Sequence, residues 1–267
     1  MPDTIYQNDT VQNTAYRKII ATLCILFVII GIIDFPTAQY PLSLFLICYF
    51  ISLFFLPYLW LIILPSFLPL IYFAPYSGRL FIDEFDFIIL TTIAANLWTP
   101  PSKPSITEKM ALGSKITLFL FCLFYLMSVA KGYFPHQSIT DNSFASYYSN
   151  LNSLRIAKGF LWALCVYPIW KQQYIIKPLQ TTYNFSIGIL IGSIGTFACM
   201  LWERGVLSGF IYAQNRYDLL DNLLNFHTKY RATGFFAEMH TGGTATDGYL
   251  MLIFPFITYF FFQAKSR

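Results

Sequence analysis

Long apolar stretches fill most of this chain, and they restrict its possible folds more than any other feature. Hydrophobic residues make up 56% of the 267 positions and charged residues only 11%, whereas a soluble domain carries about 25% charged residues. So few charges cannot cover the surface of an ordinary water-soluble enzyme, and the abundance of apolar side chains excludes a disordered chain. The composition therefore predicts an all-α, polytopic membrane protein.

The apolar stretches predict about eight transmembrane helices in a single membrane domain, residues 1–267. Their expected bounds are 19–36, 41–56, 58–74, 84–98, 116–130, 155–170, 182–202 and 245–262. The region 41–74 has two interpretations, because it is long for one span and short for two, at ~17–25 residues each. Pro57, Pro65 and Pro69 interrupt it, so it forms either two short helices or one kinked helix.

The distribution of charge favours two helices in this region. Lys and Arg concentrate on the cytoplasmic side of a membrane. With eight spans, the inside segments are 1–18, 99–115, 171–181 and 263–267. These short segments hold nine of the 17 Lys and Arg residues but only three of the 13 acids; the other 10 lie elsewhere in the chain. If 41–74 were one kinked helix, the basic residues would instead be concentrated on the outer side, against this rule. We therefore expect both termini in the cytoplasm and a large segment, 203–244, on the far side of the membrane, in the periplasm or at the cell exterior.

The remaining composition gives no sign of a cofactor. The net charge of +4 is small and does not indicate a nucleic-acid partner. Each of the five cysteines sits inside an apolar run without CxxC spacing, so we expect neither a disulfide nor a redox pair. No second His or Cys lies at ligand spacing from His240, so a metal site is not expected.

The densest polar region is 201–248. Its ionisable residues near the helix ends are Glu203, Arg204, Arg231, Glu238, His240 and Asp247. Charged groups near a membrane are costly unless they pair or serve a polar cavity. One interpretation is a solvated loop with an ion pair such as Glu203 with Arg231. The other is a site in which His240, beside Glu238, acts as a general base.

Several runs in this region and just after it resemble the O-antigen ligase-like membrane protein family, which comprises bacterial glycan ligases and polymerases. They are Trp202-Glu203-Arg204, Tyr230 to Phe236, Glu238 to Gly243, Asp247 to Leu250 and Phe254-Pro255-Phe256. The run Leu64 to Leu90, which includes Glu84-Phe85-Asp86, resembles the early helices of the same family less specifically. Together these runs cover about a third of the chain.

The resemblance implies a location and a chemistry. Family members transfer a glycan from a polyprenyl-diphosphate carrier to an acceptor, on the outer face of the bacterial inner membrane, in cell-surface polysaccharide and lipopolysaccharide assembly. It implies metal-independent glycosyl transfer with inversion. Arg231, and after it Arg204, would bind the diphosphate in a bidentate way. Glu203, Glu238 or Asp247 would orient an Arg or polarise an acceptor hydroxyl.

Family members normally continue through more helices and a large periplasmic loop that carries catalytic residues, whereas this sequence ends at Arg267. We therefore expect an N-terminal portion that does not catalyse transfer alone. It would be a fragment, an inactive relative or one half of a split enzyme whose second chain supplies the rest. The alternative function is a non-catalytic membrane component, such as a lipid-linked-sugar transporter or flippase subunit.

Overall fold

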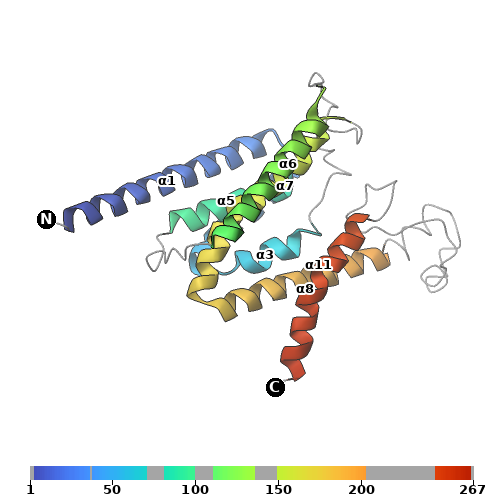
Figure 1. Ribbon diagram of the computed structural model, residues 1–267. Coiled ribbons are helices and arrows are strands. Elements are labelled where there is room, and N and C mark those ends of the chain that lie inside the picture. The colour runs from blue at the N-terminus through green and yellow to red at the C-terminus, as the bar shows by residue number, and fades with distance from the viewer. Residues whose placement is uncertain are drawn as a thin grey trace, which may run out of the picture. The chain divides into compact units, whose positions relative to one another are not determined.

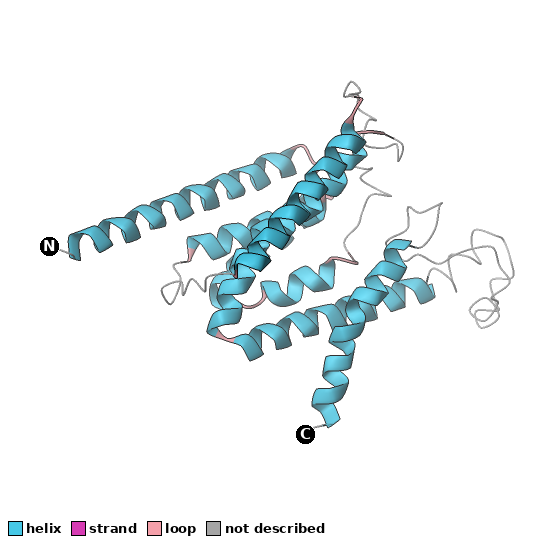
Figure 2. Ribbon diagram, viewed as in Figure 1, coloured by secondary structure: helices cyan, strands magenta, loops and turns pink. Residues whose placement is uncertain are grey.

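A computed structural model describes residues 3–36, 38–70, 81–99, 111–135, 149–202 and 244–265, and over these residues the chain is helical without strands (Figures 1 and 2). The chain divides into two compact units. The first unit comprises 1–57 and 73–178, and the second comprises 58–72 and 179–267. The all-α prediction is thus confirmed for the described part of the chain.

Eight helices lie in the described residues, one at each predicted apolar segment. The first unit holds α1 (Asp3–Ile33), α2 (Gln39–Phe55), α5 (Glu84–Trp98), α6 (Leu112–Tyr133) and α7 (Asn152–Ile176). The second holds α3 (Trp60–Phe67), α8 (Pro178–Trp202) and α11 (Thr244–Lys265). Only Pro178, the first residue of α8, is counted with the first unit. The helices α1 and α7 extend beyond the predicted segments, because an apolar stretch marks the part of a helix that suits lipid and not the ends of the helix.

Three of these helices are long and apolar enough to cross a membrane. They are Thr14–Ile33 within α1, α6 and α8, with mean hydropathies of 2.2, 1.8 and 1.8. The short helices α2 and α3 fall below that length. These three helices indicate a membrane protein, and the count of eight spans stays a prediction.

The region 41–74 contains a break after α2. That helix ends at Phe55, and Leu56 has φ −127° and ψ 76°, which is not helical. The next residue is Pro57, whose ring disfavours the α conformation at the residue before it. The next helix, α3, begins at Trp60. The local chemistry of Leu56-Pro57 therefore separates two helices here.

The helix α5 is the core of the first unit. Glu84 and every residue from Asp86 to Ala95 are buried. Three neighbouring helices reach it through different contacts. The Phe35 ring, just after α1, lies edge-on to Phe87 with centroids 5.5 Å apart, and Tyr49 of α2 is hydrogen-bonded to Thr92 at 2.8 Å. Gln173 of α7 donates to Asn96 Oδ1 at 3.4 Å.

The contacts also fix the direction of each helix in this unit. Arg17, midway along α1, reaches the carbonyls of Asn96 and Thr99 at the C-terminal end of α5, while Phe35, just after α1, meets the N-terminal part of α5. Thus α1 runs opposite to α5. Gln173 also donates to the Pro57 carbonyl, so α2 and α7 both end beside the C-terminal end of α5 and run parallel to it.

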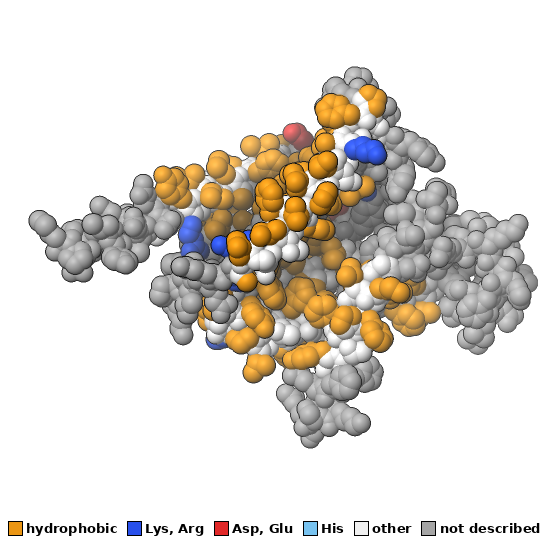
Figure 3. Space-filling view, in the orientation of Figure 1, with side chains coloured by type: hydrophobic (Ala, Val, Ile, Leu, Met, Phe, Trp, Pro, Cys, Tyr) orange, Lys and Arg blue, Asp and Glu red, His pale blue; other side chains and the backbone are white. Residues whose placement is uncertain are grey.

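The helix α6 has no buried residue and carries hydrophobic side chains along its visible face (Figure 3). It is attached to α7 through aromatic contacts. The Phe121 and Tyr125 rings lie 5.5 and 4.5 Å from the Phe160 ring, and Tyr125 donates to the Ile156 carbonyl at 3.2 Å. Phe121 and Tyr125 of α6 lie beside Phe160 of α7, and Gly132, later in α6, lies against Ser153, earlier in α7. The two helices therefore run in opposite directions.

In the second unit, α3 packs on a glycine face of α8. A Cβ atom at Gly188 would lie 2.5 Å from the Ile62 carbonyl oxygen, and one at Gly192 would lie 2.9 Å from that of Pro65. The Ser66 hydroxyl donates to the Gly188 carbonyl at 3.0 Å. The Gly188-x-x-x-Gly192 pattern predicts close helix packing, and these distances confirm it.

The helix α11 packs on another side of α8. Tyr249 and Ile253 form an apolar cluster with Ile189, and the Phe185 and Phe256 rings are 5.6 Å apart. Later residues of α8 thus meet earlier residues of α11, so the two helices run in opposite senses.

We expect Gly188→Ala to destabilise the protein, because the added methyl group collides with backbone that a rotamer change cannot move. Overpacking of this kind costs about 1–3 kcal/mol. The control is Gly159→Ala on α7, where a Cβ atom meets nothing within 4 Å and alanine raises helix propensity. Thermal unfolding in one detergent measures both variants. A melting temperature of Gly188→Ala equal to that of Gly159→Ala would contradict the close packing.

Candidate functional site

Most of the predicted site lies outside the described residues. This is true of Glu203, Arg204, Arg231, Glu238 and His240. Asp247 falls on α11, but its side chain also lies outside the described part. The roles predicted for these six residues therefore stay predictions.

The described part brings together another charged cluster at the N-terminal end of α5. Asp83 caps the helix, and its Oδ1 accepts from the backbone N–H of Asp86 at 3.2 Å. In return, Oδ2 of Asp86 accepts from the backbone N–H of Asp83 at 2.7 Å. This reciprocal capping box satisfies two N–H groups that the first turn leaves without helical partners. Both carboxylates also lie at the positive end of the helix dipole.

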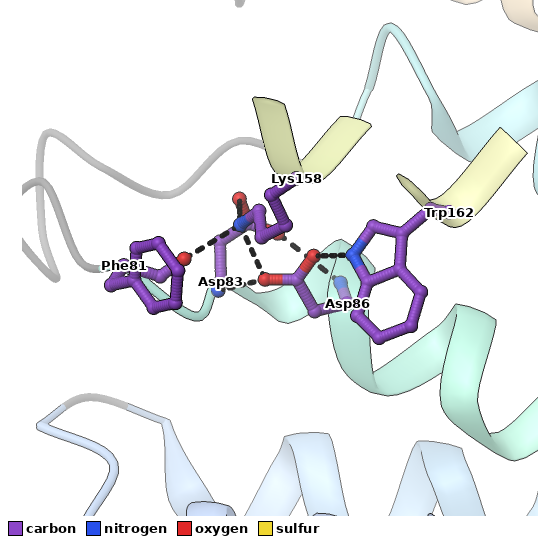
Figure 4. Close-up of polar contacts among 5 residues, drawn as sticks. All are labelled: Phe81, Asp83, Asp86, Lys158 and Trp162. Atoms are coloured by element: carbon purple, nitrogen blue, oxygen red, sulfur yellow. Dashed lines mark hydrogen bonds and ion pairs between the residues drawn. The ribbon is translucent and has the colours of Figure 1, made fainter. Parts of the chain in front are cut away.

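Lys158 of α7 completes the cluster (Figure 4). Its Nζ donates to Oδ2 of Asp86 at 2.5 Å, to Oδ2 of Asp83 at 3.0 Å and to the Phe81 carbonyl at 2.7 Å. The indole Nε1 of Trp162, one helical turn further along α7, donates to Oδ1 of Asp86 at 2.6 Å. The side chains of Asp86 and Lys158 are only 2% and 11% exposed. The four side chains form the Lys158 cluster: Asp83, Asp86, Lys158 and Trp162.

The hydrogen-bonding capacity of this cluster is largely used. An ammonium group has three N–H donors, and that of Lys158 donates to three oxygen atoms. Both oxygens of Asp86 accept hydrogen bonds as well. A lysine whose three donors are all taken has none left for a phosphate. The arrangement therefore suits a structural contact that holds α7 against α5, and not a group that binds or activates a substrate.

A second polar network closes the other end of the same helices. An NH2 group of Arg17 donates to the carbonyls of Asn96 and Thr99 at 3.1 and 3.2 Å, where the last carbonyls of α5 lack helical partners. Gln173 Nε2 donates to the Pro57 carbonyl at 3.3 Å. Polar contacts thus tie both ends of α5 to its neighbours.

Among the described residues, no group of three or more His, Cys, Asp or Glu side chains could hold a metal ion. The five cysteines are free thiols.

The Lys158 cluster was not part of the predicted site. The acids 83, 84 and 86 were visible as charges before an apolar helix, and the Asp-x-x-Asp spacing is the signal of a capping box. Nothing local identifies Lys158 as their partner, since it lies 72 residues from Asp86.

We expect Lys158→Met and Asp86→Asn each to lower thermal stability: the first leaves the poorly solvated Asp86 carboxylate without its counter-charge, and the second leaves the poorly solvated Lys158 ammonium with only the partly exposed Asp83 carboxylate. Breaking a buried pair from one side costs about 3–5 kcal/mol. The double variant should lose less than the sum of the two, since it leaves no such charge. Lys131→Met, at an exposed lysine on α6, serves as the control. Additive losses in detergent melts would show that the two groups do not interact.

Comparison with known proteins adds no family to this description: no protein-family model, no curated protein and no solved structure matches the chain.

Proposed function

We propose that the chain is a multi-pass protein of the bacterial inner membrane, related to glycan ligases and polymerases, that handles a polyprenyl-diphosphate-linked glycan on the periplasmic face. The proposal has a membrane part and a glycan part. Exposed apolar helices and charge support the first, and the path of α8 and α11 together with sequence resemblance supports the second.

Apolar exposure supports the membrane part. On α6, Phe119, Phe124, Leu126 and Met127 are each about 60% exposed, and none of its 22 residues is buried. Monomeric soluble proteins rarely expose a contiguous apolar surface larger than a few hundred Å². The helix α6 contacts α7 along one side and exposes apolar side chains on its other sides, which suits a lipid environment.

The ends of the helices in the first unit differ in charge. The end near Thr99 carries Arg17, Lys18, Lys115, Lys171 and Lys177, and none of the described acidic side chains. The four described acidic side chains, Asp34, Asp83, Glu84 and Asp86, all lie at the end near the Lys158 cluster. Basic residues favour the cytoplasmic side, which supports a cytoplasmic basic end.

The opposite directions of α1 and α5 support eight crossings. If α1 leaves the cytoplasm and α2 returns to it, an antiparallel α5 also returns to it. The chain must then cross outward once between α2 and α5, and α3 lies in that interval. A single kinked crossing in 41–74 would make α1 and α5 parallel.

The observation that carries the glycan part is the path of the chain through α8 and α11. Since these helices run in opposite senses, the chain leaves the pair after Trp202 and re-enters it at Thr244 on the same side. The segment between them holds Arg204, Arg231, Glu238 and His240. Lys177 at the basic end directly precedes α8, so a crossing by α8 delivers this segment to the periplasmic face.

The chemistry of these residues fits a diphosphate-linked donor. Arg231 and Arg204 bind the diphosphate by paired hydrogen bonds and stabilise the charge that develops when it leaves. Glu203 or Asp247 orients a guanidinium, and His240 with Glu238 accepts the proton of an acceptor hydroxyl. A transporter or flippase subunit would bind the same carrier without this last step.

The orientation is tested by single cysteines in a cysteine-free background. Asn150→Cys should react with an impermeant maleimide in intact spheroplasts, because Asn150 bonds to the Pro135 carbonyl at the end of the Lys158 cluster. Lys177→Cys should react only after permeabilisation, which is the control for reactivity. The reverse pattern would overturn the orientation.

Carrier binding is tested at Arg231. Arg231→Lys should weaken binding of a polyprenyl-diphosphate glycan about tenfold, because lysine cannot form the bidentate pair. Arg216→Lys in the same segment is the matched control. If Arg231 only pairs with Glu203, binding survives when both residues are replaced together. Unchanged binding by a folded Arg231→Ala protein would remove Arg231 from the site.

A further inference from the structure

The chain passes between its two compact units at three points. Two of these crossings lie among the described residues: one follows Pro57, between α2 and α3, and the other follows Pro178, between α7 and the rest of α8. The third, between residues 72 and 73, lies outside the described residues. The two described crossings have the same local structure.

Each described crossing is a helix end followed directly by a proline. Leu56 has φ −127° and ψ 76°, and Lys177 has φ −143° and ψ 75°, so neither residue is helical. The N–H group of each still bonds to the carbonyl four residues earlier, that of Ser52 or Gln173. Proline disfavours the α conformation at the residue before it and has no N–H to donate to the preceding helix. A single non-helical residue therefore separates each helix from the proline that follows it.

The two breaks lie side by side. Gln173 Nε2 donates to the Pro57 carbonyl at 3.3 Å, and the Gln173 carbonyl accepts from the N–H of Lys177 at 2.9 Å. One residue thus contacts both breaks. In hinge motions, a few residues at the ends of helices or strands absorb the change in φ and ψ. Two such pivots next to each other favour rotation about the line that joins them.

Each unit is held together by contacts of its own. In the first unit, Lys158 of α7 bonds to Asp83 and Asp86 at the start of α5. In the second, the backbone of α3 packs on Gly188 and Gly192 of α8. Compact units of one chain commonly move relative to one another. A rotation about the two breaks leaves the contacts within each unit intact.

We propose that Leu56-Pro57 and Lys177-Pro178 form a paired hinge about which the second unit rotates as a rigid body. Trp202 and Thr244, which flank the segment 203–244, both belong to the second unit. The rotation therefore moves both attachment points of this segment together. The hinge rests on the backbone at the two breaks and on the contacts of Gln173, and not on the glycan part of the proposed function. Failure of carrier binding leaves it unaffected.

Pulsed electron paramagnetic resonance of the full chain in nanodiscs tests this, with pairs of spin-labelled cysteines in a cysteine-free background. Ile156→Cys and Phe197→Cys place one label at an exposed position of each unit. Phe197 lies about 28 Å along α8 from Pro178. A rotation of about 15°, the size of a known rigid subunit rotation, would therefore move this label by about 7 Å. The distribution of distances between the two labels should be broadened by up to this amount.

Two pairs of labels within single units are the controls. Leu23→Cys with Ile156→Cys reports on the first unit, and Leu179→Cys with Met251→Cys reports on the second; all four positions are exposed. Both pairs should give narrow distributions, because each unit moves as one body. Equal widths for all three pairs would overturn the hinge. Broad distributions within a unit would do the same, because the units would then not be rigid.

Pro178→Ala tests the break itself. Alanine lets Lys177 adopt the helical conformation, so the variant should shift the mean distance between labels 156 and 197 and leave the distances within each unit unchanged. Pro255→Ala, inside α11 of the second unit, is the matched control and should shift none of the three distances. An unchanged distance between labels 156 and 197 in Pro178→Ala would overturn the hinge at this break. If Pro178→Ala fails to fold, the widths in the otherwise unaltered protein decide the result.

Discussion

The contact between Asp86 and Lys158 is the interaction on which the first unit depends. The helix α5 is buried on all sides, yet its first turn carries the Asp86 carboxylate, whose solvation is lost when its neighbours surround it. A buried charge without a partner costs several kcal/mol. The capping box, the lysine and the Trp162 indole supply that partner together. Because Lys158 and Trp162 both belong to α7, satisfying the end of α5 also places α7.

The two units hold their helices together by different means. The first unit uses polar groups at both ends of α5, and between them the Tyr49–Thr92 hydrogen bond and apolar contacts. The second unit packs backbone against backbone. Gly188 and Gly192 of α8 have no side chains, so the carbonyl oxygens of Ile62 and Pro65 in α3 lie where Cβ atoms would otherwise be. In lipid the hydrophobic effect gives helices little reason to associate, so close packing and hydrogen bonds carry that role. The chain uses both.

Local chemistry made the helices predictable and left their partners hidden. Apolar runs marked the helices, Leu56-Pro57 allowed a break, and Gly188 with Gly192 identified a packing face. These signals need only a few neighbouring residues. The pairing of Asp86 with Lys158 depends on which helices become neighbours, and no spacing in the sequence encodes that choice. The proposed diphosphate site was inferred from residue types and family resemblance, and five of its six residues lie outside the described part of the chain.

The placement of charge along the exposed helices has a consequence for the membrane itself. On α6, Lys115 and Lys131 are both exposed and lie about 24 Å apart along the helix axis. On α1, Arg17 and Asp34 are separated by about 25 Å. A typical hydrocarbon core is about 30 Å thick. Long side chains that extend toward the headgroups can bridge a difference of this size. In the membrane-spanning arrangement proposed above, the apolar length between these charges would make the stability of the first unit depend on the thickness of the bilayer.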